Sequence, residues 1–473
     1  MTVLVTGGSG IIGRPLIDLL LARGQRVTAL CRHPEEPDSS QLRWLTGDVS
    51  KPLLGLPDEE WQQLCREVDS IFHLAARTDF KGKSLEEYGA VNIEGVRHIK
   101  ELALISGAWL HHVSTAFVCG DWGGEFREDQ LQEGQGFHNF YEESKYRGEC
   151  VLREEPSPQY TVYRPSIVLE RRPTAASISV FGPFVFLDGV FRLCLEGAKR
   201  KNRLKTLRVE GNPRAHLPFV FNDDVALALA DLAEKSGDHG KTYHLTPAVA
   251  LPNDTLARVF NQAFAREAVA WVTAAGVEKE ELTRPEKILS KKTKVYAPYL
   301  NLTTTFARDN LEDSLGKEVL PAIKEEDLLS AFIIFLSTKK ELDRGVSHDE
   351  QFHLERYFTH FLPQYTGKPL IKNLASLSAC LQIEIKGYTT WTVTIMNGIL
   401  IRIARGSSGN FGYTTDGNTF LQVASGKMSP QQGFFQGAIQ LVANPREALR
   451  TATALEEFFR EYPYHFEPLL AHP

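Results

Sequence analysis

The sequence predicts an α/β domain built on a doubly wound parallel sheet, followed by a smaller α+β domain. Over about the first 170 residues, short apolar runs alternate with segments of helical period, which is typical of parallel strands joined by helices. From about Lys368 onward, apolar residues recur instead at every second position, as in paired strands. With 473 residues, the chain is long enough for about two or three domains.

The expected elements of the first domain follow one another as strand, helix, strand. Strands are expected at Val3–Thr6, Arg26–Cys31, Leu42–Thr46, Ser70–Ala75, Trp109–Ser114 and Tyr160–Leu169. Helices are expected at Ile12–Arg23, Ser84–Ser106 and Tyr141–Glu154. Asn222, Asp223 and Asp224 are expected to cap a further helix, Val225–Lys235, and residues of about 250 to 345 are mostly of helical pattern. Such alternation predicts helices on both faces of the sheet.

The second domain is expected to hold an antiparallel sheet. Its strands are Leu381–Ile385, Thr390–Ile395 and Ile399–Ile403, and Asn397-Gly398 between the last two is a strong hairpin signal. Pro445–Arg460 is expected to form a closing helix. The charged stretch Ser337–Asp349 is the expected linker, so we place the domains at residues 1–345 and 346–473.

The overall composition narrows the classes of function. A net charge of −6 gives no general reason to expect nucleic acid as a partner. The six cysteines are scattered without a C-x-x-C pair, so neither a zinc site nor a disulfide framework is expected, and they fit a reducing compartment. The longest apolar stretch, Ser177–Leu195, is interrupted by glycine, proline and charged residues, and the N-terminus enters a strand at once. We therefore expect a cytoplasmic protein with no membrane span and no metal site.

A glycine-rich turn begins the first domain. Gly7, Gly10 and Gly13 follow a strand and open a helix, where backbone must approach a diphosphate closely and side chains would block it. The helix N-terminus adds N–H donors and a favourable dipole. The pattern after Thr6 reads TGxxGxxG, so the turn predicts a Rossmann-type nucleotide site.

The end of the second strand indicates which nicotinamide cofactor fits. A carboxylate there would hold the ribose hydroxyls of NAD, whereas this chain has Arg32 and no acidic residue before Glu35. Arg32 is placed to pair with a 2′-phosphate, so NADPH is favoured; the alternative is a solvated arginine at a helix start. Asp48 ends the third strand, where a carboxylate can accept from the adenine amino group. A turn-forming aspartate is the competing interpretation.

A tyrosine and a lysine four residues apart, Tyr141 and Lys145 in YEESK, follow the glycine turn. Tyrosine is a poor acid near neutral pH, with an ordinary pKa of about 10. A lysine on the same helix face stabilises tyrosinate and can hold the nicotinamide ribose. Thr115, after the expected strand Trp109–Ser114, adds a hydroxyl that can hold a substrate oxygen while charge develops on it. Ser114 is the alternative to Thr115.

Taken together, these motifs resemble the extended short-chain dehydrogenase/reductases over about the first 260 residues. The resemblance is carried in order by Thr6–Gly13, Gly47-Asp48, His73–Ala76, Asn92, Val113–Ala116, YEESK and Tyr163–Ser166. It implies Thr115, Tyr141 and Lys145 as catalytic residues, and Asn92 as a helix-kinking or water-holding residue. The implied cofactor-binding residues are Gly7, Gly10, Ile11, Ile12, Gly13, Arg32, Asp48, Val49, Ala75, Lys145 and Pro165.

A narrower resemblance is to the thioester reductases and fatty acyl-CoA reductases of the male-sterility type. It is carried by Gly47–Pro52, Leu54–Leu56, Val68–His73 and Thr78–Phe80, with a faint match at Tyr296–Leu300 and Phe306–Asn310. The resemblance implies reduction of an acyl thioester with NADPH to an aldehyde or an alcohol. Hydride would attack the thioester carbonyl, and Thr115 and Tyr141 would stabilise the oxyanion before the thiol is expelled.

Three further groups of residues allow two interpretations each. Phe181, Phe184, Phe186 and Phe191 either line an acyl channel or pack in ordinary core. A basic cluster is either a mouth for coenzyme A phosphates, an acidic carrier protein or a membrane surface, or a solvated face. Its members are Lys199, Arg200, Lys201, Arg203, Lys205 and Arg208. His73, His111 and His112 are interpreted as structural rather than metal ligands.

The C-terminal residues resemble the sterol carrier protein type of lipid-binding domain. The resemblance is carried by Thr390–Thr394, Asn397-Gly398, Phe420, Ser425–Pro430 and Phe434–Gly437, while Ala438 replaces a usual basic residue. It implies an apolar tunnel for sterols, fatty acids or acyl-CoAs. The alternative is a domain that only caps the reductase or mediates dimerisation.

The leading hypothesis is an NADPH-dependent reductase of a lipid-like acyl thioester, carried by coenzyme A or an acyl carrier protein. One alternative is a hydroxysteroid or ketone dehydrogenase of the same fold. Another, of a different class, is a lipid-binding or transfer protein whose reductase half binds cofactor structurally.

Overall fold

The computed structural model of the chain describes residues 2–32, 38–174, 182–199, 205–235, 240–272, 282–343, 348–370, 378–435 and 438–465. It divides into two compact units, Met1–Leu336 and Ser337–Pro473. The charged stretch that we expected to be a linker is helical for its first half, because helix α11 runs from Glu325 to Asp343.

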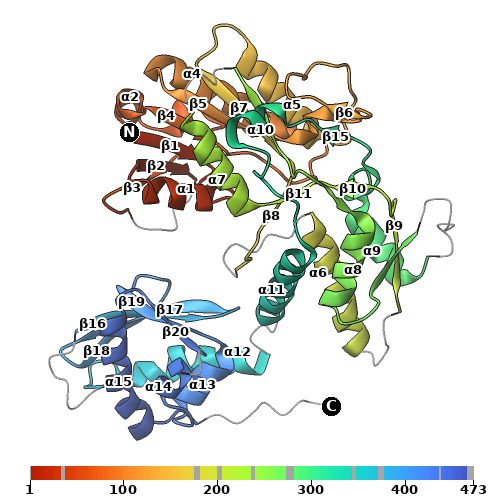
Figure 1. The fold of residues 1–473 in the computed structure, drawn as a ribbon. Helices are drawn as coiled ribbons and strands as arrows, with labels where there is room; N and C mark the ends of the chain where they lie inside the picture. Colours follow the sequence, from red (N-terminus) through yellow and green to blue (C-terminus); the bar gives the residue numbers. More distant parts are fainter. Residues whose placement is uncertain are drawn as a thin grey trace. The chain divides into compact units, whose positions relative to one another are not determined.

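A seven-stranded parallel sheet forms the centre of the first unit (Figure 1). Its order is β3-β2-β1-β4-β5-β7-β12, and every neighbouring pair is parallel. The strands are β1 (Thr2–Thr6), β2 (Arg26–Cys31), β3 (Leu42–Thr46), β4 (Ser70–His73), β5 (Trp109–Val113), β7 (Tyr160–Pro165) and β12 (Thr242–Leu245). The order reverses between β1 and β4, so a crevice opens at the carboxyl ends of these strands. The predicted doubly wound α/β fold is confirmed.

Helices cover both faces of this sheet (Figure 1). On one face lie α1 (Gly13–Ala22) and α7 (Asn222–Ala233), whose apolar side chains share a core with Val3, Val5 and Val27. On the other lie α2 (Asp58–Glu67), α4 (Gly95–Ser106) and α5 (Phe140–Arg153), which pack on Leu4 and Ile71. Successive residues of β1 thus enter opposite cores, as the alternation of a strand requires.

Three expected elements differ from the structure. The strand expected over Tyr160–Leu169 breaks at Ser166, and β8 (Ile167–Leu169) pairs with β11 (Phe219–Phe221) in a separate sheet. The break follows Pro165, which has no N–H to continue a ladder. The helix expected over Ser84–Ser106 contains a π-helical turn, Ala90–Glu94, centred on Asn92. Helix α7 already begins at Asn222, so the residues expected as its cap form its first turn.

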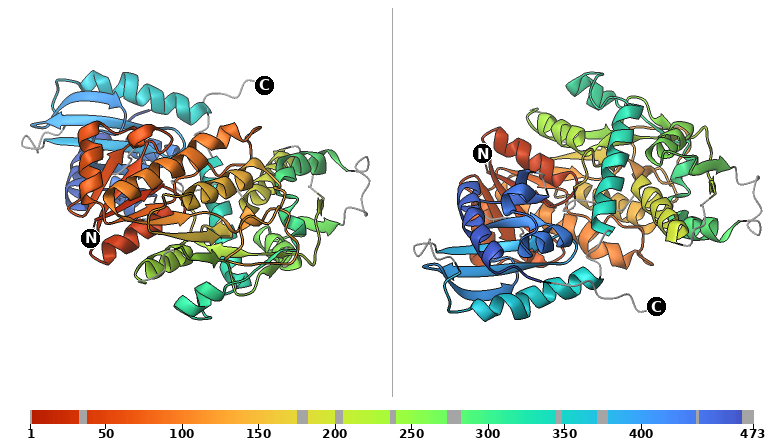
Figure 2. Two further views of the ribbon diagram at one scale, coloured as in Figure 1. Left: turned by 90° about the horizontal axis from the view of Figure 1, so that it is seen from above. Right: turned by 90° about the horizontal axis from the view of Figure 1, so that it is seen from below.

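Later segments of the first unit lie beside the sheet (Figure 2). Their apolar side chains form a second core. Strands β9 (Leu207–Glu210) and β14 (Val269–Val272) pair in parallel, so this region is not purely helical. The helices around them are α6 (Pro183–Lys199), α8 (Asn253–Ala263), α9 (Arg284–Thr293) and α11. Phe184 stacks on Phe335 of α11 at 4.7 Å between ring centroids, which places Phe184 in ordinary core.

The second unit contains a five-stranded sheet of order β18-β17-β16-β19-β20. Its strands are β16 (Ala379–Ile385), β17 (Thr389–Met396), β18 (Ile399–Arg405), β19 (Phe411–Thr415) and β20 (Ile439–Val442). The expected antiparallel sheet is mixed, because β16 and β19 run parallel. The predicted hairpin is confirmed, since Asn397 and Gly398 both have positive φ, at 52° and 77°.

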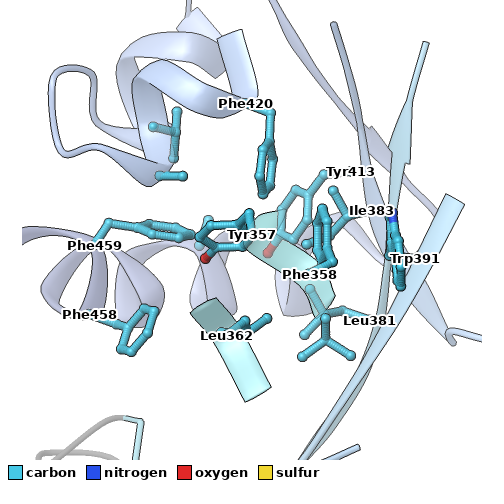
Figure 3. Close-up of a cluster of buried hydrophobic side chains, with 14 of the residues drawn as sticks. Tyr357, Phe358, Leu362, Leu381, Ile383, Trp391, Tyr413, Phe420, Phe458 and Phe459 are labelled. Atoms are coloured by element: carbon cyan, nitrogen blue, oxygen red, sulfur yellow. The ribbon is translucent and has the colours of Figure 1, made fainter. Parts of the chain in front are cut away.

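Helices of the second unit cover its sheet and enclose an aromatic core (Figure 3). They are α12 (His348–Arg356), α13 (Gly417–Ala424), α14 (Pro430–Phe435) and α15 (Pro445–Glu461), the last close to its predicted bounds. Phe358 stacks on Trp391 at 4.8 Å and on Phe420 at 5.1 Å between ring centroids. Aromatic side chains therefore fill much of the space between sheet and helices.

Candidate active site

A cavity of about 810 Å³ opens in the first unit at the carboxyl ends of β1, β4 and β5. It extends from the glycine turn to the second apolar core. All residues predicted for catalysis and cofactor binding line it: Gly7, Gly10, Ile11, Ile12, Gly13, Arg32, Asp48, Val49, Ala75, Thr115, Tyr141, Lys145 and Pro165. The fold therefore brings together residues that are spread over 159 positions of sequence, from 7 to 165.

The glycine turn has no room for side chains. Gly7 has a φ of 74°, and a Cβ there would lie 2.7 Å from the main-chain nitrogen of Ala75. A Cβ at Gly13 would lie 2.2 Å from the carbonyl oxygen of Gly7. Glycine at these positions therefore lets the turn pack closely against the loop after β4 and against itself, directly before helix α1. This geometry fits a bound dinucleotide diphosphate.

Arg32 and Asp48 lie at the ends of neighbouring strands, where the cavity wall turns outward. Arg32 follows β2 and is exposed. The Asp48 carboxylate accepts hydrogen bonds from the Ser50 main-chain N–H at 3.0 Å and the Ser50 hydroxyl at 2.7 Å. Partial burial alone would raise the pKa of Asp48, but these bonds and the charge of Arg32 lower it overall. The aspartate therefore makes the expected turn while facing the cavity as an anion.

Thr115 and Tyr141 present adjacent hydroxyl groups. Thr115 follows β5 and caps a short 3-10 turn, and its hydroxyl accepts from the Phe117 N–H at 3.3 Å. The same hydroxyl donates to the carbonyl oxygen of Pro165 at 3.4 Å. Tyr141, in the first turn of α5, shares a side-chain hydrogen bond with Thr115. Two hydroxyls on different elements thus converge on one point of the cavity.

Lys145 lies one turn further along α5, in a buried position. Only 3% of its surface is exposed, and its ammonium group donates to the carbonyl oxygen of Val113 at 2.8 Å. Burial lowers its pKa to about 8, although the charge of Glu149 opposes the shift. We expected Lys145 to lower the pKa of Tyr141. Instead, burial raises the pKa of Tyr141 to about 12, although the hydrogen bond between Tyr141 and Thr115 opposes the shift, so the tyrosine is protonated and able to donate.

The Asn92 side chain ties the π-helical turn to the cavity rim. Its amide group donates to the hydroxyl of Ser144 at 2.8 Å, and its oxygen accepts from the Arg77 N–H at 2.8 Å. It therefore fixes the loop after β4 to helix α5. Within the described residues the Ser166 hydroxyl, which also lines the cavity, is buried without a hydrogen-bond partner.

Beyond Tyr141 the cavity becomes an apolar chamber between β9, β14, α6 and α8. Its walls are Phe186, Val209, Leu217, Phe219, Leu256, Ala257, Phe260, Val269, Trp271 and Leu300. Of the four phenylalanines singled out in the sequence, Phe186 lines this chamber. Phe184 and Phe191 do not, and Phe181 lies outside the described residues. The other wall residues were not predicted: Leu300 ends the Tyr296–Leu300 match, which assigned no role to single residues, and the rest come from segments that carry no motif.

Four aromatic side chains around Tyr141 were also missed as site residues. Phe80, Phe117, Tyr296 and Tyr299 line the cavity, and the ring of Phe80 lies 5.6 Å from that of Tyr141. Phe80 and Tyr296 both fall in segments that resembled the thioester reductases. That resemblance was the available signal, but it assigned no role to individual side chains.

The basic cluster expected near the active site is only partly described, since residues 200–204 lie outside the described ranges. Arg208 forms an ion pair with Glu286, with nitrogen-to-oxygen distances of 2.8 Å and 3.1 Å.

The buried histidines of the sheet are uncharged. Burial lowers the pKa of His73 to about 3 and also lowers that of its neighbour His112. Across the described ranges, no group of three or more ligating side chains is arranged to hold a metal ion.

The second unit has a cavity of about 60 Å³ between its sheet and its helices. It is lined by Ile383, Tyr413, Thr415, Phe420, Val423, Pro430, Gln431, Phe434, Ile439, Leu441, Ala452, Leu455 and Phe459. Pockets that hold drug-sized ligands have volumes of roughly 300–1,000 Å³. The cavity has the position and the apolar character of a lipid site, but aromatic side chains fill most of its space.

Among the described helices, none is long and apolar enough to cross a membrane.

Two family models match the chain. Residues 34–226 match the male sterility protein family, and residues 358–456 match the SCP-2 sterol transfer family. The chain joins a male sterility NAD-binding domain to an SCP-2 domain. The SCP-2 match begins at Phe358, whose ring stacks on Trp391. The aromatic core therefore belongs to this domain.

Curated relatives match part of the chain. Equisetin synthetase of Fusarium heterosporum is 39% identical over 127 residues, which is 25% of this chain and 3% of that protein. The carboxylic acid reductase of Segniliparus rugosus is 26% identical over 278 residues, 50% of this chain and 23% of the relative. A 3-beta-hydroxysteroid dehydrogenase of Mycolicibacterium neoaurum is 30% identical over 152 residues, 30% of this chain and 40% of the relative. The chain thus spans less than half the length of each of these relatives.

Solved structures share the fold of the first unit. The terminal R domain of the myxalamid PKS-NRPS biosynthetic pathway matches with a TM-score of 0.58 and 23% identity, over 72% of this chain and 90% of that one. A dTDP-glucose 4,6-dehydratase of Streptomyces venezuelae, with NAD bound, matches with a TM-score of 0.52 and 19% identity, over 72% and 98%. The male sterility domain therefore has the extended short-chain dehydrogenase/reductase fold.

Proposed function

We propose that the protein is an NADPH-dependent reductase that converts a lipid-like acyl thioester to an aldehyde or an alcohol. One observation carries the proposal: a single cavity joins the glycine turn, the Thr115–Tyr141 hydroxyl pair and an apolar chamber. The cavity thus offers adjoining sites for the nucleotide, for the reacting carbonyl and for the apolar chain of the substrate. The relationship to a carboxylic acid reductase and to the synthetases supports a thioester as the substrate class.

NADPH rather than NADH is proposed because of the charge at the end of β2. Arg32 is exposed there at the cavity edge. A guanidinium in this position fits a 2′-phosphate, whereas the ribose hydroxyls of NAD require a carboxylate. The glycine turn, Asp48, Ala75 and Pro165 would complete the nucleotide site. When bound, NADPH supplies the hydride for the carbonyl carbon.

The chain's own residues then act on the oxygen and on the orientation of the substrate. The hydroxyls of Tyr141 and Thr115 donate hydrogen bonds to the carbonyl oxygen as negative charge develops on it. Lys145 holds the nicotinamide ribose and favours that charge. When the oxyanion collapses, the carbon–sulfur bond breaks, the thiolate leaves and takes a proton from solvent, and the aldehyde remains. No protein nucleophile is needed.

The apolar chamber supports a long hydrocarbon chain as the acyl group, because its walls carry no charged side chain. The SCP-2 domain supports a hydrophobic ligand as well, handled in its own apolar interior. The thiol portion would be coenzyme A or the arm of an acyl carrier protein, the partner class that the synthetase relatives suggest. We also propose that the enzyme is cytoplasmic and that its surface contacts lipid.

The stoichiometry of the reaction tests this proposal. With a long-chain acyl-CoA and NADPH, one free thiol is expected for each NADPH consumed if the aldehyde is the product. Two NADPH per thiol would identify the alcohol. NADPH consumption with a ketone or a ketosteroid, and none with the acyl-CoA, would instead favour the ketone or hydroxysteroid chemistry of the second candidate, which the hydroxysteroid dehydrogenase relative supports.

A further inference from the structure

A buried carboxylate next to the catalytic tyrosine takes no part in the mechanism above. Glu142 is the third residue of α5 and has no exposed surface, at 0%. Burying a charge is costly unless hydrogen bonds satisfy it. The partners of its two oxygens therefore show what the residue does.

One oxygen of Glu142 closes the start of helix α5. Oε2 accepts from the main-chain N–H of His138 at 2.8 Å and lies 3.2 Å from the His138 Nδ1. In return, the side chain of Asn139 accepts from the Glu142 N–H at 3.0 Å. These reciprocal bonds cap the helix, and a carboxylate here also suits the positive end of the helix dipole. This half of the interaction is local.

The other oxygen reaches a residue 157 positions further along the chain. Oε1 accepts from the hydroxyl of Tyr299 at 2.5 Å, and that hydroxyl accepts from the Asn139 side-chain amide at 2.8 Å. Capping the helix requires neither bond. Two side chains at the start of α5, those of Glu142 and Asn139, therefore form hydrogen bonds with the hydroxyl of Tyr299.

The ring of Tyr299 forms part of the cavity wall beside Tyr141. It packs edge-on against Phe117 at 4.9 Å and parallel to Phe80 at 5.7 Å between centroids. Phe80 in turn lies 5.6 Å from the ring of Tyr141. All four residues line the cavity, so the ring of Tyr299 belongs to the wall next to Tyr141.

We propose that Glu142 is a positioning residue whose Oε1 fixes Tyr299 as the wall that holds the reacting end of the substrate against Tyr141. This inference rests on the proposed reductase function. Glu142 acts through Tyr299 and moves no proton of the reaction. When Tyr299 is not held in place, the thioester can bind in unproductive orientations. The kcat/KM for the acyl substrate is then lowered, whereas the affinity for the nucleotide is not.

Tyr299→Phe in the full chain tests the inference, because it removes the hydroxyl and leaves both the ring and the helix cap. A matched control is Tyr243→Phe, whose hydroxyl pairs with Ser314 at 3.1 Å outside the cavity. We expect kcat/KM for a long-chain acyl-CoA to fall by about tenfold in Tyr299→Phe, the scale of a hydrogen bond to a charged group. The Kd for NADPH should stay within about twofold. The control should change neither quantity.

Hydrogen exchange supplies a readout that does not need turnover. Residues 296–301 are expected to take up deuterium faster in Tyr299→Phe than in the wild type or in Tyr243→Phe. Adding Glu142→Gln to Tyr299→Phe should lower kcat/KM by no more than about twofold further, since the two act in series.

Unchanged exchange at residues 296–301 would overturn the inference, and so would an unchanged kcat/KM in Tyr299→Phe. A further fall of well over twofold when Glu142→Gln is added to Tyr299→Phe would also overturn it, because Glu142 would then act independently of Tyr299. If the wild type reduces no thioester at all, the proposed function fails, while the exchange experiment still decides whether Glu142 holds Tyr299.

Discussion

The ammonium nitrogen of Lys145 lies 2.8 Å from the main-chain carbonyl oxygen of Val113, at the carboxyl end of β5. This bond joins the helix that carries Tyr141 to the strand that leads into Thr115. The two hydroxyls of the site are therefore held together by the fold itself. Such preorganised donors stabilise developing charge without further rearrangement.

Replacing Tyr141 with phenylalanine removes the hydroxyl proposed to stabilise the oxyanion, while the ring still fills its place. We expect turnover to fall by about 10²–10³-fold, the usual contribution of one hydrogen-bond donor to an oxyanion. NADPH binding should change by less than about twofold, because the glycine turn and Arg32 are untouched. Steady-state kinetics with an acyl-CoA and fluorescence titration of NADPH measure the two effects. Turnover that survives the replacement would show that another group supports the oxyanion.

The buried charge of Lys145 predicts a pH dependence of activity. Its pKa is lowered to about 8, so the ammonium form is lost as pH rises through that value. We expect kcat/KM, which reports the free enzyme, to decline above about pH 8. Lys145→Arg should be less active but should lack this decline, because arginine stays charged. A decline at the same pH in both proteins would assign it to another group.

The same shift predicts how stability depends on pH. The ordinary pKa of this lysine is 10.5, so between about pH 8 and 10.5 the unfolded chain binds a proton that the folded chain lacks. Stability therefore rises with pH in this window relative to Lys145→Met, which has no such proton. Denaturation of both proteins at pH 7 and pH 10 measures the difference. A wild type that gains nothing over the variant between these values would contradict the lowered pKa.

Arg32 should decide between the two nicotinamide cofactors. In Arg32→Ala, NADPH binding is expected to weaken by about 10–100-fold, the range for a hydrogen bond between charged groups. NADH binding should hardly change. Arg26→Ala is a matched control, because Arg26 is exposed at the opposite end of the same strand. Equal losses for both nucleotides would contradict a 2′-phosphate contact.

Arg164 and Glu149 form a fully buried ion pair behind the active site. Both side chains are 0% exposed, and the two are joined by hydrogen bonds of 2.8 Å and 2.9 Å. Arg164→Met leaves the carboxylate buried without its main partner and should destabilise the first unit by about 3–5 kcal/mol. Adding Glu149→Leu should recover most of that loss. Denaturant unfolding measures both, and a double variant less stable than the single one would contradict the prediction.

The aromatic core limits the cavity of the SCP-2 domain. Phe420 lines that cavity and packs on Tyr357 and Phe358, each at 5.1 Å between centroids. Phe420→Ala should enlarge the cavity at a cost of about 3–5 kcal/mol in stability. We expect a fluorescent fatty acid to bind severalfold more tightly to this variant than to the wild type. Phe352→Ala, at an exposed position on α12, is the control. Weaker binding in Phe420→Ala than in the wild type would show that Phe420 contacts the lipid.

Much of the fold was predictable because strands and turns carry local signals. Arg26–Cys31 and Leu42–Thr46 form strands with the predicted bounds, and the Asn397-Gly398 turn has the positive φ values that its residues favour. The break at Ser166 and the parallel pairing of β16 with β19 were not predicted. Both depend on partners distant in sequence, which a local pattern does not reveal.

The candidate site divides in the same way. The sequence identified the residues that belong to recognisable motifs, such as Gly7, Tyr141 and Lys145. These residues line one cavity. Their assigned roles stay predictions. The Glu142–Tyr299 contact was missed because its partners lie 157 residues apart, and neither the YEESK motif nor the Tyr296–Leu300 match indicates that they meet. Most walls of the apolar chamber come from segments that carry no motif. Three-dimensional packing alone brings them together.

The most direct test of the central proposal is NADPH oxidation, followed at the nicotinamide absorbance. Substrates are a long-chain acyl-CoA, a ketone of matched chain length and a 3-ketosteroid, with Tyr141→Phe as the inactive control. We expect consumption with the acyl-CoA, matched by release of free thiol, and none with the ketones. Consumption with ketones or steroids alone would contradict the proposal and assign the protein to the dehydrogenases of this fold.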